Sequence, residues 1–228
     1  MTEKRLQREL DKLKKRILSL GAMAEERVRM TVKAIQSRDD NLAAEIIRMD
    51  YEIDENEVEI EEECLKVLAL YQPVAVDLRF IVAAIKINND LERVADETVN
   101  IAKCVQRIAK QAKLEVSFGY YQMAQKAEFM VKMSLDALVN LDLDRSFRVL
   151  MLDDEVDRIH SNIHDRVKEA ILQQPDRVEY LINLLLISRH LERIGDHATN
   201  IAEEVIYMIE GEIVRHGKWD QGDDEAGG

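Results

Sequence analysis

Apolar residues recur along most of the chain at alternating steps of three and four. The first stripe of this kind is carried by Leu6, Leu10, Leu13, Ile17, Leu20, Val28, Thr31 and Ile35. A later stripe is carried by Ile81, Ala84, Ile85, Leu91, Ala95, Thr98 and Ala102. Such spacing places the apolar side chains on one face of an α-helix. We therefore predict long amphipathic helices that each bury one face.

Breaks in these stripes divide the chain into six predicted helices. The first ends where Ser37 to Asp40 brings in residue types that favour helix N-caps, and the second runs from there to about Tyr71. Pro73 suits the first turn of the third helix, which reaches about residue 113. After a break at residues 117–119, the fourth, fifth and sixth helices end at about residues 140, 173 and 210, and Pro175 opens the sixth.

The second half of the chain repeats the plan of the first. Asp39 corresponds to Asp142 at an offset of 103 residues, and Pro73 corresponds to Pro175 at an offset of 102. The segment LERVADETVNIA, from Leu91, corresponds to LERIGDHATNIA at an offset of 100. We predict an all-α fold of two tandem three-helix bundles, packed side by side with pseudo-twofold symmetry. The first repeat spans residues 1–113, the second spans 117–210, and residues 211–228 form a polar tail that we expect to be disordered.

The composition agrees with this fold and restricts the function. Aromatic residues make up 5% of the chain and charged residues 34%, which is typical of long helices rather than of a sheet protein. The formal net charge of −13 repels phosphates, so we expect no nucleic-acid partner, whereas hard cations or a basic protein surface fit it. We find no apolar signal core at the N-terminus and no apolar run that spans a bilayer, and we expect a cytoplasmic protein.

Polar residues are repeated within the apolar pattern as well. Positions four apart lie on one face of a helix, so each repeated segment carries a ladder of oxygen-bearing side chains beside its apolar face. These ladders consist of Glu92, Asp96 and Asn100 in the first repeat and of Glu192, Asp196 and Asn200 in the second. Core packing explains the repeated apolar residues, but it does not require two repeated carboxylates and a repeated amide.

A further ladder lies on the preceding helix of each repeat. It consists of Asp50, Asp54, Glu57 and Glu61 in the first repeat and of Asp153, Asp157, His160 and His164 in the second. Carboxylate and imidazole are interchangeable ligands of first-row metals, so the exchange of two Glu for two His keeps ligand chemistry. If the two helices are antiparallel neighbours, the ladders face each other and a cation relieves their repulsion. We therefore predict sites for divalent or trivalent ions (Fe, Zn, Mn or Mg), with Glu57, Glu61, His160 and His164 as additional candidate ligands.

Plainer explanations exist for several of these features. The ladders are also compatible with a solvated helix face on which Arg93 and Arg193 pair with carboxylates. We interpret His190 as a surface residue and His197 as a polar neighbour of the ladder rather than as a ligand. The aromatic turn at residues 117–121 (SFGYY) is interpreted as a packing corner rather than a nucleotide platform. No GxSxG, HExxH or GxGxxG motif occurs, so we expect no enzyme.

The paired LERxxDxxxNIA segments resemble those of the PhoU family, the phosphate-uptake regulators of bacteria. The resemblance extends over nearly the whole chain, including residues 23–26, the pair Gln72-Pro73 with residues 77–79 after it, and the doubled three-helix plan. The family's metal motif is (Glu/Asp)xxxAsp, and it matches Asp50/Asp54, Glu92/Asp96, Asp153/Asp157 and Glu192/Asp196. The second repeat departs from the pattern after its proline, where Asp176-Arg177 stands in place of Asp-x-Arg.

The resemblance implies a cytoplasmic negative regulator of phosphate uptake and of the phosphate-starvation response, peripheral to the inner membrane through its partners. It implies a metal-binding adaptor between the ATPase subunit of a phosphate ABC transporter and a sensor histidine kinase, and a homodimer. Two alternatives remain open. The first is a metal-dependent phosphohydrolase, in which clustered metals activate water. The second is a metal-free structural helical interaction protein, in which the acidic ladders bind no ligand.

Overall fold

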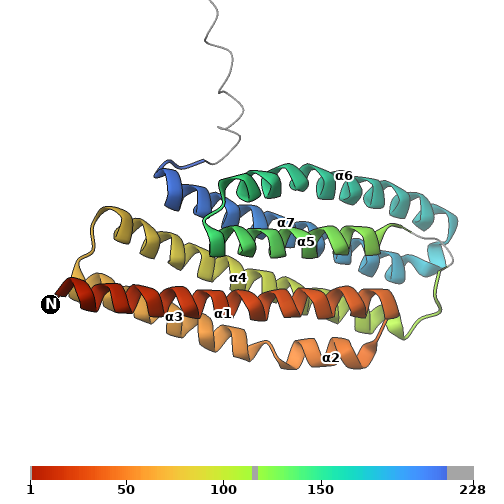
Figure 1. The fold of residues 1–228 in the computed structure, drawn as a ribbon. Coiled ribbons are helices and arrows are strands. Elements are labelled where there is room, and N and C mark those ends of the chain that lie inside the picture. Colours follow the sequence, from red (N-terminus) through yellow and green to blue (C-terminus); the bar gives the residue numbers. More distant parts are fainter. Residues whose placement is uncertain (1, 115–117, 215–228) are drawn as a thin grey trace, which may run out of the picture.

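The computed structural model describes residues 2–114 and 118–214, and these residues form seven α-helices and one 3₁₀ turn (Figure 1). In chain order they are α1 (Thr2–Ser37), α2 (Asp40–Arg48), α3 (Tyr51–Tyr71), α4 (Ala75–Ala109), α5 (Tyr120–Asn140), α6 (Leu143–Gln173), η1 (Pro175–Arg177) and α7 (Val178–Glu210). The described part contains no strand, so the all-α prediction is confirmed. None of its helices combines the length and apolar character that a membrane span requires. Most of the predicted tail, residues 215–228, and the predicted break at residue 117 lie outside the described residues.

Local sequence signals set several of the helix ends. The Oδ1 of Asp39 accepts hydrogen bonds from two backbone N–H groups of α2, at 2.9 and 3.0 Å. Its counterpart Asp142 accepts one from α6 at 3.0 Å, so the two predicted N-caps are confirmed. The third predicted helix is shorter than expected at both ends, since α4 begins after Pro73 and ends before residue 113. Gly211 ends α7 with a φ of 78°, in the left-handed region that glycine adopts without strain.

The prediction of a single helix over residues 40–71 is wrong, because the chain breaks between α2 and α3 at Met49 and Asp50. On α1, Nη2 of Arg27 donates to the carbonyl oxygen of Met49 at 3.4 Å and to Oε2 of Glu52 at 2.7 Å. Arg27 is only 4% exposed, so its charge needs acceptors at this point. In the second repeat Met130 occupies the matching position, offers no donor, and α6 runs unbroken. The break between α2 and α3 therefore coincides with the contact that Arg27 of α1 makes with the backbone at Met49.

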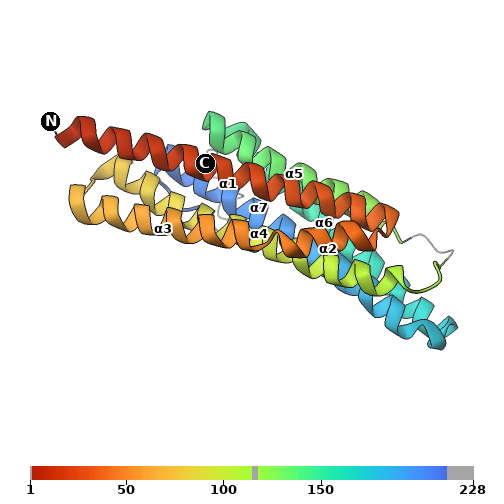
Figure 2. The ribbon, with the colours of Figure 1, turned by 90° about the horizontal axis from the view of Figure 1, so that it is seen from below.

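Each repeat forms its own bundle, as predicted. In the first, α1 packs against α2, α3 and α4, and in the second, α5, α6 and α7 pack against one another. Figures 1 and 2 show the two bundles lying along each other, with α4 beside α7 and α1 beside α5. A Cβ atom on Gly21 would lie 2.6 Å from Cδ2 of Leu135, so glycine permits the close approach of α1 to α5.

The contact between α4 and α7 has pseudo-twofold symmetry. His190 Nδ1 lies 2.6 Å from Oε2 of Glu97, and His197 Nδ1 lies 2.9 Å from Oδ1 of Asp90. At the offset of 100 residues Asp90 corresponds to His190 and Glu97 to His197, so the symmetry exchanges the two contacts. Nη1 of Arg193 adds an ion pair to Glu97 at 2.8 Å. The interpretation of His190 as a surface residue is wrong, because its side chain is only 17% exposed.

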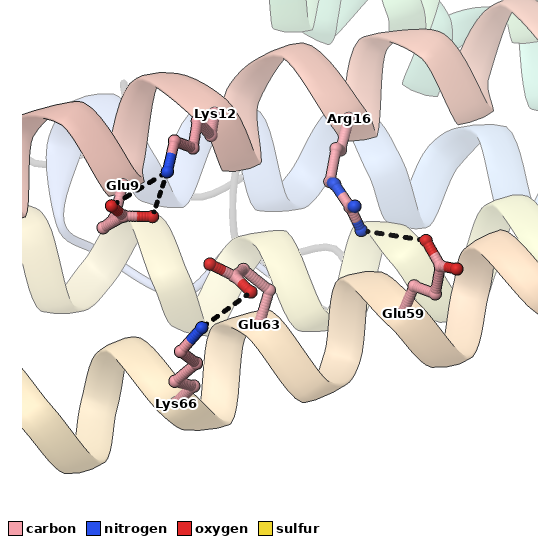
Figure 3. A network of polar contacts seen from close by, with 6 residues as sticks. All are labelled: Glu9, Lys12, Arg16, Glu59, Glu63 and Lys66. Carbon is pink, nitrogen blue, oxygen red and sulfur yellow. Dashed lines mark hydrogen bonds and ion pairs between the residues drawn. The ribbon is translucent and has the colours of Figure 1, made fainter.

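Ion pairs lie along the outer edge of the first bundle, on α1 and α3. Figure 3 shows the side chains involved: Glu9, Lys12, Arg16, Glu59, Glu63 and Lys66. Of the ion pairs drawn in Figure 3, the one between Nη1 of Arg16 and Oε2 of Glu59, 3.2 Å apart, joins the two helices, and the others lie within one helix each. The Glu59 side chain is 62% exposed, so this pair contributes about 0–1 kcal/mol. These carboxylates form a solvated face that is separate from the ladders.

Candidate metal centres

The two ladders of each repeat lie on helices that pack against each other, α3 with α4 and α6 with α7. Equivalent contacts join the helices in both repeats. Asn88 Nδ2 on α4 donates to the backbone carbonyl of Glu57 on α3 at 2.9 Å. At the equivalent positions, Nδ1 of His160 on α6 lies 3.2 Å from Oγ of Ser188 on α7. The two helices that carry the ladders are therefore neighbours in both repeats, and the ladders face each other in each.

In the first repeat the carboxylates crowd at the contact between α3 and α4. Burial raises the pKa of Asp50, and the charges of Asp54 and Asp96 raise it further. Burial also raises the pKa of Glu92 to about 7, followed by the effects of Asp96 and Asp54. The pKa of Asp96 is raised by burial and then by Asp54. The ionised forms of these carboxyl groups are therefore disfavoured first by burial and then by the negative charge of their neighbours.

The second repeat reproduces this crowding between α6 and α7. Burial raises the pKa of Asp153 to about 7, and Asp157 and Asp196 are the next causes. The pKa of Glu192 is raised by burial and then by Asp196 and Asp157, and that of Asp196 by burial and then by Asp157. Burial lowers the pKa of His160, which favours the neutral imidazole that a metal ligand requires. The cluster thus combines carboxylate oxygens with an available nitrogen.

The two clusters differ in how their charge is compensated. In the first, the charges of Lys103 and then of Arg27 oppose the rise in the pKa of Asp50. In the second, Met130 replaces the arginine, and Oδ1 of Asp153 is buried with no hydrogen-bond partner among the described residues. A Cβ atom on Gly195 would lie 3.4 Å from this oxygen, so the glycine keeps the space beside it open. The unpartnered oxygen makes the second cluster the better fit to a cation.

Some members of the ladders lie at the margins of these clusters. Asn200 Nδ2 donates to Oδ1 of Asp90 at 3.0 Å, across the contact between α4 and α7. Asn100 lies beside Glu97 in the same contact. The His164 side chain is 43% exposed. The Asn200 amide therefore joins the two repeats, whereas Asn100 lies beside an acid of its own helix.

The remaining two candidates, Glu57 and Glu61, border a polar pocket of about 610 Å³ between α3, α4 and α7. Asp90 and Asn200 line the same pocket from the other helices. Burial raises the pKa of Glu57, and the charge of Glu61 is the next cause. These two carboxylates therefore link the first cluster to the contact between the repeats.

The donor chemistry of both clusters fits a hard cation, because facing carboxylates with raised pKa values gain most from added positive charge. The residues that would hold it are Asp50, Asp54, Glu92 and Asp96 in the first repeat and Asp153, Asp157, Glu192 and Asp196 in the second. Within residues 2–114 and 118–214, no three His, Cys, Asp or Glu side chains are grouped closely enough to hold a metal ion. Binding therefore requires rotation of side chains on otherwise fixed helices.

Sequence reasoning missed Asp90 and Glu97, which join the repeats, and the buried Arg27, which contacts Glu52 within the first repeat. Asp90 and Glu97 lie outside the ladders, and Arg27 lies in an apolar stripe. The signal for Asp90 and Glu97 was the alignment of the two repeats at an offset of 100 residues. In that alignment an acid corresponds to a histidine twice, because Asp90 corresponds to His190 and Glu97 corresponds to His197. An acid and a histidine exchanged at two equivalent positions indicate a pair of symmetric contacts between duplicated helices.

A duplicated three-helix unit with paired acidic clusters defines a class of helical proteins that carry two homologous bundles in one chain. The PhoU domain matches this chain twice, at residues 17–105 and 120–205, which coincide with the two bundles. The chain belongs to the PhoU family, as the resemblance of its repeated segments indicated.

Relatives match over nearly their whole length. The "phosphate-specific transport system accessory protein PhoU homolog" of Clostridium acetobutylicum is 36% identical over 215 residues, covering 94% of this chain and 98% of that protein. The crystal structure of PhoU from Pseudomonas aeruginosa superposes with a TM-score of 0.87 at 32% identity, covering 90% of this chain and 99% of the other. That of the phosphate transport system regulatory protein PhoU from Streptococcus pneumoniae gives 0.83 at 29% identity, covering 92% and 100%.

Proposed function

We propose that this protein is an accessory of a phosphate-specific transport system that represses phosphate uptake and the phosphate-starvation response when phosphate is plentiful. The names of its relatives support the link to phosphate transport, and the match covers both repeats. The single observation that carries the mechanism is the presence, at equivalent places in the two repeats, of facing carboxylates with raised pKa values.

In this proposal the protein acts in the cytoplasm as an adaptor between the transporter's ATPase subunit and a sensor histidine kinase. The rigid helices α3, α4, α6 and α7 orient the carboxylates, and the ladders provide an acidic surface for the partners. A bound divalent or trivalent ion supplies positive charge that neutralises the carboxylates and can attract an oxygen of a phosphate group or of a partner's carboxylate. The symmetric contact between α4 and α7 fixes the two clusters relative to each other.

A genetic experiment tests the regulatory role. The gene is deleted in the source organism, alkaline phosphatase output is measured in excess phosphate, and the strain is complemented with the wild type. We expect high output in the deletion strain and low output after complementation. Unchanged output in a deletion strain that has no second PhoU gene contradicts the proposal.

A chemical experiment tests the metal centres. Metal content of the purified protein is measured for the wild type, for Asp96→Ala/Asp196→Ala, and for the matched control Asp11→Ala/Asp144→Ala, whose exposed carboxylates lie outside the ladders. We expect the first variant alone to lose bound metal and to fail in complementation. Normal metal content in that variant contradicts the site assignment. Complementation by a variant that has lost its metal favours a metal-free interaction protein.

A further inference from the structure

α3 lies at the edge of the first bundle, where it packs against α1 and α4 (Figure 2). Its outward side carries Tyr51, Val58 and Leu65, which recur every seven residues and so lie on one face of the helix. These residues are 58%, 51% and 53% exposed, and the exposed Ala69 continues the row. The row, which we call the outer stripe, follows about 27 Å of helix. Exposed apolar residues scattered singly need no explanation, but a row along one face indicates an interaction surface.

The second repeat shows that the fold does not require the outer stripe. α6 is the counterpart of α3, and at the offset of 103 residues its equivalent positions hold Asp154, Ser161 and Lys168. These three residues are exposed, like their counterparts on α3. Positions that face the core stay apolar in both helices, as Ile60 and Ile163 do. The outer stripe is therefore explained by a contact that α3 makes and α6 does not.

The charge around the outer stripe specifies the chemistry of its partner. α3 contains eight Asp and Glu residues and one Lys. Glu55 and Glu62 are exposed on one side of the stripe. Asp54 and Glu61, which belong to the ladder, are exposed on the other. A second copy of α3 would double this negative charge at the contact, and an anionic lipid surface would be repelled by it. A helix with an apolar row flanked by Lys or Arg complements both features.

The contact between α3 and α1 leaves the outer stripe uncovered. Figure 3 shows Arg16 on α1 against Glu59 of α3, with 3.2 Å between the paired atoms. Glu59 follows Val58 directly, so it is turned about 100° away from the stripe around the helix. Glu55 and Glu62 form no ion pair with another residue in the described ranges 2–114 and 118–214. Their charges are therefore available to a partner that covers the stripe.

We propose that the outer stripe of α3 is a docking surface for a basic amphipathic helix of a partner protein. The apolar residues of that helix lie against Tyr51, Val58 and Leu65, and its Lys and Arg side chains pair with Glu55 and Glu62. Because α6 lacks the stripe, we expect one bound helix per chain. The inference goes beyond the proposed regulatory function, since it depends neither on phosphate nor on a bound metal.

Fluorescence anisotropy of a labelled model peptide tests the proposal on the full-length protein, in EDTA so that no metal ion neutralises the ladders. The probe is a three-heptad peptide with Leu at positions a and d and with Lys at e and g, where like charges oppose its self-association. We expect a Kd on the order of 10 µM. Val58→Ser/Leu65→Lys, which installs the residues of α6, should weaken binding about tenfold or more. Glu55→Lys/Glu62→Lys should weaken it by about the same factor through charge repulsion.

Matched controls lie on α6. Asp165→Lys makes the charge change at the position equivalent to Glu62, and Leu172→Ser removes an apolar side chain that is even more exposed than the stripe. Both should change the Kd less than about twofold. A peptide of the same composition in scrambled order should bind about tenfold more weakly or worse.

Three kinds of result overturn the proposal. The first is that the peptide does not bind, or binds the α3 variants as tightly as the wild type. The second is that the α6 controls lose as much affinity as the α3 variants. The third is that another partner covers the stripe: a dimer of the wild type that Val58→Ser/Leu65→Lys dissociates would identify a second copy, and binding to phosphatidylglycerol vesicles that the same variant abolishes would identify a lipid surface.

Discussion

The ionised carboxylates of the second cluster should destabilise the protein when no cation is bound. Burial, and then Asp157 and Asp196, raise the pKa of Asp153 from the ordinary 3.8 to about 7. At about 1.4 kcal/mol per pKa unit, this rise corresponds to about 4 kcal/mol. Asp153 is only half-buried, so solvent screening reduces the value to about 2 kcal/mol. Because the folded-state pKa of Asp153 exceeds the unfolded one, the protonated carboxyl stabilises the fold relative to the ionised one. This contribution is fully present below pH 4 and is lost as the pH rises through 7.

The substitution Asp153→Asn removes the charge and keeps the shape. In EDTA we expect it to raise the free energy of unfolding by about 2 kcal/mol at pH 8, and by about half as much at pH 5.5. For a chain of this size the gain at pH 8 amounts to about 4–8 °C in Tm, which calorimetry resolves. Asp165→Asn, at a position on the same helix that is 73% exposed, is the control and should stay within about 0.5 kcal/mol of the wild type.

The reasoning is refuted if Asp153→Asn lowers the Tm in EDTA, or if its gain is the same at both pH values. Addition of Mn²⁺ or Mg²⁺ extends the experiment to the proposed metal site. We expect the ion to raise the Tm of the wild type and to have a smaller effect on the variant, because the ion and the substitution relieve the same repulsion. An equal rise in both proteins places the bound ion elsewhere.

Three further substitutions test the packing. Glu97→Leu should cost about 2–4 kcal/mol in urea unfolding because it leaves Arg193 and His190 without the acceptor that they share, and the double variant with His190→Leu should cost less than the sum of the two single changes. Gly21→Val should cost about 1–3 kcal/mol, since even its Cβ meets Leu135, and an unchanged Tm would show that α1 and α5 separate freely. Asp39→Ala should cost about 1 kcal/mol, measured by calorimetry, while Asp39→Asn keeps the cap and should not.

The helices and the duplication were predictable because both are written in local patterns. Apolar spacing identified the helical faces, and Asp39 and Asp142 marked two helix starts that the structure confirms. The facing of the ladders was predicted on the condition that the two helices of each repeat are antiparallel neighbours, and the packing of α3 against α4 and of α6 against α7 meets the neighbour condition. These features depend on contacts close in sequence or on comparison of one half with the other.

Features that depend on distant contacts were not predictable in the same way. The break between α2 and α3 goes with a hydrogen bond from Arg27, and no glycine or proline marks it. The register of α4 against α7 decides that His190 is covered, and helix periodicity does not contain that register. The grouping of ligands in each cluster also depends on side-chain rotation, which no sequence pattern specifies.

The exchanged acid and histidine positions have a consequence for how the halves recognise each other. Two copies of the first repeat, packed as α4 and α7 are, would set Asp90 against Glu97 twice, acid facing acid. Two copies of the second would set His190 against His197, imidazole facing imidazole. Only the unlike pairing matches each acid with a histidine. The two halves are therefore alike in shape, but each pairs selectively with the other. A single copy pairing with itself would lack this selectivity.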